Sequence, residues 1–493
     1  MTTSPVSTRA DPPPRSTPPA KRLLAGLFLL AWIPRLTLVL VFLQLPLGLD
    51  DMYQYDMLGL SIARGNGYRW YQRDYVERLE DYFGRWYHID LSPPSVPEQG
   101  YLTVFRPPGY PTFLAAVYLV AGETNRLAAV RLVQSLLGAA LAPLTLLLAR
   151  RLRLPDRAGC MAAIVVALYP ILWMYPIGLG SENLFILLTV LGAILMLRAG
   201  DDRKPTSALA AGLMLGMAAL TRGALALFLI FAVGWLGRTA GWRQAAVFSL
   251  AVAAFLIPWS IRNSLVLGRP AFVENSMGYN LFVGYHPQGN GGFVSSVALI
   301  PTRFIGDDER DRWTMQQAIG FVRDDPLRAL ALLPKRLAYM AAFETRELVY
   351  FYSNNVFGPL PTPLLVLAYL VLVIPWLAVA GSAPFGLASA EAHHGRNLVL
   401  LLIGATLLGY VPVLAEPRFH LPLVPFLAPF AAAAWLQPSV FLSPRSKEGR
   451  LAYRLAVAAF AVLIVLWGSE IVRQAPQLAE ILSAGGNRLF LAY

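Results

Sequence analysis

The sequence predicts an all-α polytopic membrane protein with about eleven transmembrane helices. Three observations lead to this prediction: 56% of the 493 residues are hydrophobic, only 14% are charged, and the mean hydropathy is +0.52. A typical soluble domain carries roughly 25% charged residues. Apolar runs also recur between short polar segments along the chain. Most of the surface of these runs must therefore face lipid or other apolar helices.

The net charge of +12 has a simple explanation in such a chain. Basic residues gather in the short segments 21–22, 150–157, 198–204 and 237–243, which the positive-inside rule places in the cytoplasm. No basic face or binding motif accompanies the charge, which argues against a nucleic-acid partner. The single cysteine, Cys160, lies in an apolar run, which excludes a disulfide framework and a thiolate metal site.

The first 126 residues predict a tail and one span, followed by a long loop. Residues 1–22 are rich in Pro, Ser and Thr and predict a disordered cytoplasmic tail. Residues 23–43 are long and apolar enough to form the first transmembrane helix. Residues 44–126 predict the first extracytoplasmic loop, in which aromatic residues interleaved with charges favour juxtamembrane helices. Residues 112–121 are apolar but too short to span, so we expect one of these helices there.

The remainder predicts two further groups of transmembrane helices. Residues 127–260 and 362–470 hold these helices, and residues 261–361 predict a second long extracytoplasmic segment because Gly and Pro are dense there. Residues 471–493 predict an extracytoplasmic tail. The absence of a tandem repeat weighs against the two-half architecture of many secondary transporters.

Charged residues outside the basic loops fall on the predicted outer side, together with several tyrosines. A shared surface there could place a carboxylate as general base beside guanidinium groups that bind a phosphate. The alternative is that each charge is a solvated helix end. The candidate catalytic residues are Asp51 and Asp50, and the candidate substrate-binding residues are Arg106, Tyr55, Tyr110, Glu182, Arg222, Arg262, Arg418 and His420.

Several of these residues stand in short motifs that occur in a fixed order. The motifs are Asp51-Met52-Tyr53-Gln54-Tyr55, Arg106-Pro107-Pro108-Gly109-Tyr110-Pro111, Ser181-Glu182, Thr221-Arg222, Ile261-Arg262-Asn263 and Arg418-Phe419-His420. Taken together, they resemble the bacterial GT-C glycosyltransferases. The closest resemblance is to the branch of the protein O-mannosyltransferases and the lipid A 4-amino-4-deoxyarabinose transferase. The resemblance extends from about residue 23 to residue 435.

The resemblance implies a GT-C fold and an enzyme that uses a polyprenyl-phosphate-linked monosaccharide. It assigns the general base to Asp51, with Asp50 as the other candidate, and places Arg106 on the donor phosphate. Arg262 and Arg418 become further contacts to phosphate or acceptor. Some relatives have an Asp-Glu pair where this chain has Asp51-Met52, so a role of that Glu does not transfer.

The expected reaction is displacement at the anomeric carbon, in which arginines stabilise the departing phosphate and a carboxylate takes the proton of an acceptor hydroxyl. The acceptor can be a glycan, a lipid or a protein. No cofactor is expected; some relatives of this fold use a divalent metal with several acidic residues in the first loop, and that alternative stays open here. The resemblance implies the bacterial inner membrane, with a cytoplasmic N-terminus and an extracytoplasmic active site. The alternative function is a transporter or flippase of lipid-linked sugars, which needs ionisable groups near mid-membrane.

Two other polar features are weaker indications of a binding site. His393 and His394 are adjacent in a predicted cytoplasmic loop with no carboxylate at ligand spacing, which favours a solvated loop over a metal site. The glycine-rich residues 284–292 lack the Lys-Ser/Thr that follows a phosphate-binding loop. We expect either a flexible connection or a loop that orders over substrate.

Overall fold

The computed structural model describes residues 19–47, 51–77, 97–303, 306–353, 355–444 and 449–488. Nearly all of this chain is helical, apart from one two-stranded antiparallel pair, β1 (Arg69–Trp70) with β2 (Tyr101–Leu102). Most of the predicted tail, and also Asp50, lie outside the described residues. The α-helices are α1 (Lys21–Val41), α2 (Asp51–Ala63), α4 (Gly109–Arg151), α5 (Asp156–Ala167), α6 (Ile171–Met174), α7 (Glu182–Asp202), α8 (Pro205–Thr221), α9 (Ala226–Thr239), α10 (Trp242–Leu267), α11 (Met277–Tyr285), α12 (Ser295–Ala298), α13 (Asp307–Asp324), α14 (Pro326–Ala341), α15 (Arg346–Ser353), α16 (Thr362–Ser389), α17 (His394–Tyr410), α18 (Val424–Trp435) and α19 (Arg450–Ile481). The 3₁₀ helices are η1 (Tyr175–Ile177), η2 (Gly223–Leu225), η3 (Ile300–Arg303), η4 (Pro417–Leu423), η5 (Pro438–Phe441) and η6 (Gly486–Arg488).

Among the described residues, six helices are long and apolar enough to cross a membrane: α1, α4, α7, α10, α16 and α19. A seventh span results if α5 and the helical residues 171–177, bent by 53°, count as one. The prediction of an all-α membrane protein is confirmed, but the count of eleven spans is not. Several predicted spans fall in helices of 12 to 17 residues, such as α8, α17 and α18. At 1.5 Å per residue, these helices are shorter than the roughly 30 Å apolar core.

Two helices also extend beyond the predicted boundaries. Helix α10 continues through Arg262 to Leu267, so the predicted second loop begins inside a helix. Helix α19 runs to Ile481, well into the predicted C-terminal tail. Both helices contain a proline, a residue that often ends a helix. Where neighbouring groups satisfy the freed backbone, the helix continues.

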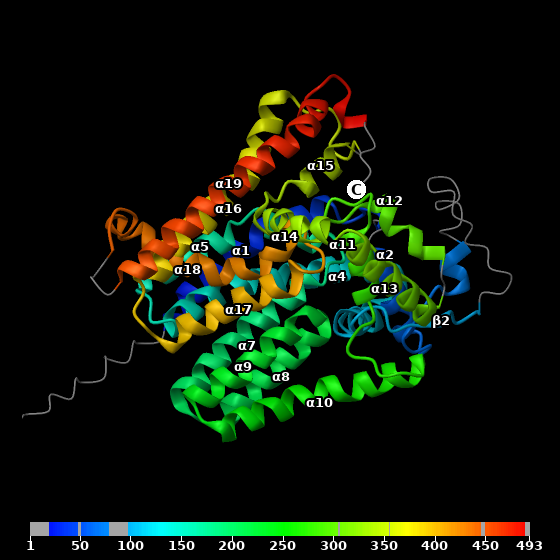
Figure 1. Cartoon of the computed structure of the whole chain (residues 1–493), viewed down its shortest axis with the longest axis horizontal. Helices are drawn as coiled ribbons and strands as arrows, with labels where there is room; N and C mark the ends of the chain where they lie inside the picture. Colours follow the sequence, from blue (N-terminus) through cyan, green and yellow to red (C-terminus); the bar gives the residue numbers. More distant parts are fainter. Residues whose placement is uncertain are drawn as a thin grey trace, which may run out of the picture.

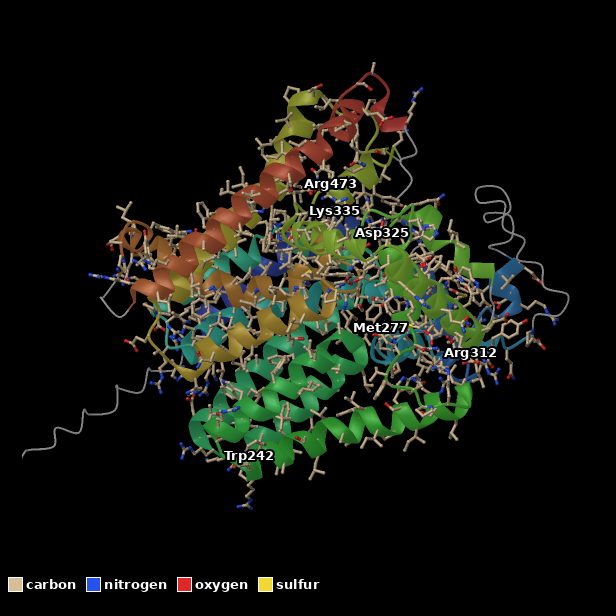
Figure 2. All side chains as sticks on the ribbon, in the orientation of Figure 1. Trp242, Met277, Arg312, Asp325, Lys335 and Arg473 are labelled. Carbon is tan, nitrogen blue, oxygen red and sulfur yellow. The ribbon has the colours of Figure 1, made fainter. Side chains whose placement is uncertain are left out.

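The long helices pack together in a bundle, and a group of shorter helices lies against it (Figure 1). Helix α8 packs against both α7 and α10, and α16 packs against α18 and α19. The shorter helices α11 and α13 pack on each other beside the bundle. Trp242 stands at one end of the molecule in Figure 2, and Arg312 of α13 lies on the opposite side of the view.

Residues 51–77 and 97–108, between α1 and α4, pack against the helices rather than forming an open loop. Helix α2 lies on the first half of α4, and its aromatic residues are buried there together with Trp70 and Phe105. The carboxylate of Asp56, fully buried, accepts hydrogen bonds from Tyr118 at 2.8 Å, Tyr75 at 3.1 Å and the Arg126 guanidinium at 2.9 Å. These contacts fix the orientation of α2 and of the residues at its N-terminus.

Helix α4 is two helices joined at a kink. Gly122 has φ 75° and ψ 161°, which most L-residues avoid, and it separates the part that carries α2 from the part that runs through the bundle. The predicted helix at residues 112–121 and the predicted span from residue 127 fall on the two sides of this glycine. The kink lets a packed outer segment connect directly to a membrane-spanning helix.

Gly386 is where α16 and α18 approach most closely, and it supports a stability prediction. A Cβ on Gly386 would lie 1.9 Å from the carbonyl oxygen of Phe430. We expect Gly386→Ala to lower stability by about 1–3 kcal/mol, because the two backbones must separate. Thermal unfolding in detergent measures the effect. Gly404→Ala is the matched control, since a Cβ there meets nothing within 4 Å, and an equal effect of the two substitutions would contradict the prediction.

Candidate active site

Five charged residues from distant parts of the chain meet at one end of the bundle. Asp51 is the first residue of α2 and Glu182 the first residue of α7. Arg106 precedes α4, Arg222 follows α8, and Arg418 lies in η4. Each stands at or just beyond a helix end, where the backbone stops packing and side chains can turn inward.

Asp51 and Arg106 form an ion pair between the two ends of the first polar segment. Arg106 Nη2 donates to Asp51 Oδ1, and Arg106 Nε donates to Gln54 Oε1 at 2.8 Å. Asp51 and Gln54 are three residues apart on one face of α2 and so contact the same guanidinium. The prediction placed these two charges on one surface, and the structure brings them into contact.

Arg418 connects this pair to a second one. Its Nη1 lies 3.1 Å from Asp51 Oδ2 and 3.9 Å from Glu182 Oε1, and its Nε donates to Glu416 Oε2 at 2.6 Å. Arg222 Nη1 lies 2.6 Å from Glu182 Oε1. Alternating charges therefore run from Arg106 to Arg222.

Aromatic rings pack against the guanidinium group of Arg106. Arg106 lies 5.5 Å from the ring centroid of Tyr55 and 5.2 Å from that of Phe105. The Tyr55 ring in turn packs edge-on against Tyr110, whose hydroxyl donates to Gln134 at 2.5 Å. Tyr110 is fully buried, so it positions Tyr55 rather than facing a ligand.

The carboxylate of Asp51 is ionised by its surroundings. Burial would raise its pKa, but the charges of Arg106, Arg418 and Arg222 outweigh burial and hold its pKa well below the usual value. The side chains of Asp51, Arg106 and Arg418 are 27%, 19% and 25% exposed. A ligand from solvent or the membrane surface can therefore reach these three groups, whereas Glu182, at 4%, is covered.

Two predicted site residues have other surroundings. Arg262 donates to the backbone carbonyls of Thr103 at 2.5 Å and Tyr68 at 3.2 Å, contacts that hold the polypeptide next to Arg106. His420 is 2% exposed and stacks on Trp376 with ring centroids 3.7 Å apart. Its Nδ1 contacts the carbonyl of Met340 at 2.9 Å, and its Nε2 lies 2.5 Å from Glu344. We therefore do not place His420 among the groups that face a ligand.

Glu274 is a carboxylate of the site that sequence reasoning missed. It follows α10 in a loop without any motif, and it accepts a hydrogen bond from Ser276 at 3.0 Å. A Cβ on Gly223 would lie 2.4 Å from its Oε1, so the carboxylate stands directly against the turn after Arg222. Burial raises the pKa of Glu274 despite the nearby charges of Arg106 and Arg222. Gln54, Glu416 and Arg346 were missed as well. Gln54 and Glu416 had a signal, because Gln54 lies within the motif of Asp51 and Tyr55 and Glu416 lies two residues before Arg418.

Two pockets adjoin the charged residues. One, with about 240 Å³ of empty space that includes its opening to solvent, is lined by Tyr175, Glu344, Arg346 and Arg418 together with apolar residues. The other, with about 400 Å³ of such space, is mostly apolar and lies between α7, α9, α17 and η4. The rings of Phe185 and Phe419 line this apolar pocket, and both also lie beneath the guanidinium of Arg222, at 5.9 and 5.5 Å. The apolar pocket thus begins where the charged residues end.

Asp51, Glu182 and Glu416 are each paired with arginines, an arrangement that suits an anion better than a metal. Within the part of the chain that the structure describes, the three side chains grouped so as to hold a metal ion are Asp201, His393 and His394, which lie elsewhere.

Part of the candidate active site lies in a segment that matches a known protein family. The family model for dolichyl-phosphate-mannose-protein mannosyltransferases matches residues 105–261. This third of the chain is similar to that family. The match begins one residue before Arg106 and includes Glu182 and Arg222, whereas Asp51 and Arg418 lie outside it. The resemblance that the motifs predict is thereby confirmed over these residues. A search of the curated proteins finds no match.

Solved structures give a more distant similarity. The oligosaccharyltransferase AglB from Archaeoglobus fulgidus, in complex with an inhibitory peptide and a dolichol-phosphate, is 14% identical with a TM-score of 0.44; the match covers 90% of this chain and 55% of that one. The same oligosaccharyltransferase tethered to an acceptor peptide is also 14% identical, with a TM-score of 0.45 and coverage of 96% and 60%. The present chain thus spans less than two thirds of these proteins.

Proposed function

We propose that the chain is a membrane glycosyltransferase that moves a monosaccharide from a polyprenyl-phosphate carrier to an acceptor hydroxyl. The observation that carries the proposal is the convergence of Asp51, Arg106 and Arg418, all partly exposed, at one end of a helical bundle. The match of residues 105–261 to the mannosyltransferase family supports it. As the motif resemblance implies, the site faces away from the cytoplasm.

Arg106 and Arg418 are the proposed phosphate ligands. Both guanidinium groups bind Asp51 from opposite oxygens, so a space bounded by two fixed cations already accommodates an anion. Guanidinium pairs bind phosphate oxygens through charge-assisted hydrogen bonds and do not titrate. During transfer, the bond from the anomeric carbon to the phosphate oxygen breaks, and the same cations stabilise the negative charge left on the polyprenyl phosphate.

Asp51 is the proposed general base. When the donor phosphate takes over part of the contacts of Arg106 and Arg418, the carboxylate is released to accept the proton of the acceptor hydroxyl. The hydroxyl oxygen attacks the anomeric carbon opposite the departing phosphate, and the configuration inverts. Asp50, adjacent in the chain, remains the other candidate, and Glu274 is a third carboxylate, near Arg106 and Arg222.

The pH dependence of kcat/KM separates Asp51 from Glu274. This parameter reports ionisations of the free enzyme. Asp51 has a depressed pKa and is ionised throughout the neutral range, so we expect no fall in kcat/KM until the pH is below the ordinary value of 3.8. If Glu274 were the base, its raised pKa would make kcat/KM fall with decreasing pH already above 4.5. If kcat/KM of the wild type falls with decreasing pH already above 4.5, and this fall is absent in Glu274→Gln, the assignment of the base to Asp51 is contradicted.

The apolar pocket is the proposed site of the first isoprene units of the carrier. Ala405 and Leu408 lie on the same helix, α17, but Ala405 lines the pocket and is 2% exposed, whereas Leu408 is 59% exposed. We expect Ala405→Phe to raise KM for a long-chain donor about tenfold, equivalent to roughly 1.4 kcal/mol of lost binding. The matched control Leu408→Phe should leave KM unchanged. Equal KM values for the two variants would exclude this pocket.

A transfer assay tests the proposal as a whole. The purified chain, reconstituted in vesicles, is incubated with a panel of labelled polyprenyl-phosphate monosaccharides and with membranes as the source of acceptor. We expect label to leave the lipid carrier with at least one donor and to appear in a glycan, glycolipid or protein. If every donor crosses the bilayer with its sugar still attached, the chain is a flippase and the proposed transfer is wrong.

A further inference from the structure

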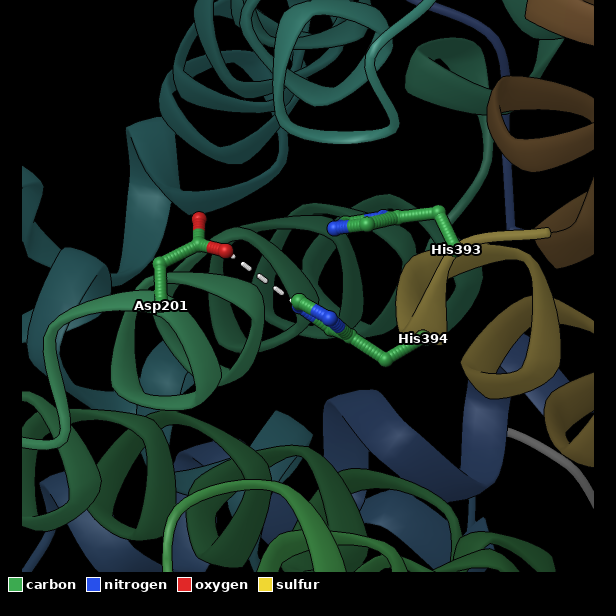
Figure 3. Close-up of side chains that lie close together, drawn as sticks. All are labelled: Asp201, His393 and His394. Carbon is green, nitrogen blue, oxygen red and sulfur yellow. Dashed lines mark ion pairs between the residues drawn. The ribbon is translucent and has the colours of Figure 1, made fainter. Parts of the chain in front are cut away.

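A second polar cluster lies at the opposite end of α7 from the candidate active site. Asp201 is the next-to-last residue of α7, whose first residue is Glu182, and these 21 residues span roughly 30 Å. His394 is the first residue of α17 and His393 precedes it. Figure 3 shows the carboxylate of Asp201 facing both imidazole rings across the gap between the two helices.

The three side chains present donor atoms at metal-ligand separations. One donor atom from each lies within 4.8 Å of the other two, and His394 Nε2 is 3.3 Å from Asp201 Oδ1. Two ligands bound tetrahedrally to zinc at about 2.0–2.1 Å lie roughly 3.3 Å apart. The His394–Asp201 pair has this separation already, and the His393 donor atom lies within 4.8 Å of both.

The cluster contains a buried polar atom without a hydrogen-bond partner. His393 is 9% exposed, and its Nε2 is buried and makes no hydrogen bond with any described residue. The neighbouring His394 Nε2 is also buried and is paired with the Asp201 carboxylate at 3.3 Å. A buried polar atom without a partner costs free energy, so the Nε2 of His393 beside this His394–Asp201 pair points to a missing ligand.

Neighbouring residues hold the three side chains in position. Trp235 Nε1 donates to the backbone carbonyl of His394 at 3.0 Å, and its ring packs against the His394 ring. Arg151 Nη1 donates to Asp201 Oδ2 at 3.3 Å, which leaves Oδ1 directed at the histidines. Contacts of this kind orient ligands in metal sites.

Metal coordination through His393 Nε2 requires a change at the other ring nitrogen, Nδ1. His393 Nδ1 accepts the backbone N–H of Gly395 at 3.1 Å, which places the ring proton on Nε2. Coordination through Nε2 requires this proton to move to Nδ1, and the helix cap at Gly395 is then lost. Metal binding must therefore outweigh the loss of this one hydrogen bond.

We propose that Asp201, His393 and His394 bind a divalent transition metal, with zinc as the best fit. Two imidazole nitrogens and one carboxylate oxygen suit zinc and disfavour calcium and magnesium, which prefer oxygen ligands. Water completes the coordination. The metal joins the end of α7 to the start of α17, two segments 192 positions apart in the chain.

Metal content and binding test the site directly. The full-length protein is purified in detergent with a tag that contains no histidine, stripped with chelator and titrated with zinc chloride alone. We expect one zinc per chain, and an increase in thermal unfolding temperature because zinc binds the folded state. His393→Ala and Asp201→Asn should each weaken zinc binding more than about 100-fold, since even outer partners of metal ligands account for 10–100-fold.

Matched variants distinguish this site from unspecific binding. His286→Ala removes a histidine at a distance from the cluster, and Asp156→Asn removes an exposed carboxylate that pairs with Arg150; both should bind zinc as the wild type does. The tetrahedral absorption of bound cobalt should disappear only in the ligand variants. The absence of saturable zinc binding to the wild-type protein, or equal zinc affinity in His393→Ala and His286→Ala, would refute the proposal.

Discussion

Asp51→Asn is expected to lower kcat/KM for sugar transfer by about 10²- to 10⁴-fold, the range typical of a lost general base. Asparagine keeps the shape and can still accept a hydrogen bond from Arg106, but it cannot take a proton. The loss of charge also leaves Arg106 and Arg418 without the anion that lies between them. Initial rates with the preferred donor measure the effect.

The control for this substitution is Asp74→Asn. Asp74 pairs with Arg64 on an exposed part of the same polar segment, so its replacement removes the same charge without touching the site. We expect Asp74→Asn to transfer sugar at the wild-type rate. Full activity of Asp51→Asn together with loss of activity in Asp50→Asn would move the base to Asp50, and full activity in both variants would remove the general base from this end of α2.

Arg106→Gln is expected to lower kcat/KM by about 10²- to 10³-fold, as for other donors that stabilise charge in a transition state. Arg106 is a better residue to replace than Arg222, because Asp51 keeps Arg418 as a partner at 3.1 Å and no carboxylate is left unpaired. Replacement of Arg222, in contrast, removes the partner at 2.6 Å from the covered Glu182 and is expected to destabilise the fold. Rates and thermal unfolding of the same preparations separate the two effects.

Two comparison variants complete this test. Arg64→Gln removes an exposed guanidinium and should change neither rate nor stability by more than a small factor. Arg262→Gln should act mainly on stability, because its guanidinium binds the carbonyls of Thr103 and Tyr68. If Arg106→Gln loses stability as much as activity, its role is structural.

The pairing of Asp51 with Arg106 could be predicted from the sequence because each residue stands in a short motif at one end of the same polar segment. A chain that leaves and re-enters a bundle brings the ends of such a segment together. The contribution of Arg418 was harder to predict, since it depends on how η4, more than 300 residues later, packs against α7.

The environment of His420 could not be predicted from its neighbours. Arg418 and His420 are two residues apart, but in the 3₁₀ helix η4 this separation directs one side chain to the ion pairs and the other to Trp376. The count of eleven spans is not confirmed because several predicted spans fall in helices of 12 to 17 residues, and hydropathy alone does not show how long a helix is. Asp201 was overlooked as the partner of His394 because it comes from a different helix, nearly 200 residues earlier.

Binding of a polyprenyl monophosphate tests the central claim most directly, because this product is the same whatever sugar is transferred. A soluble short-chain polyprenyl monophosphate is titrated into the purified protein, with the corresponding alcohol as competitor. We predict saturable binding that an equal concentration of the alcohol does not displace, and a loss of about tenfold or more in Arg106→Gln, since a hydrogen bond to a charged group contributes roughly 1.5–3 kcal/mol. Equal affinity for the phosphate and the alcohol, or an unchanged affinity in Arg106→Gln, would contradict the account.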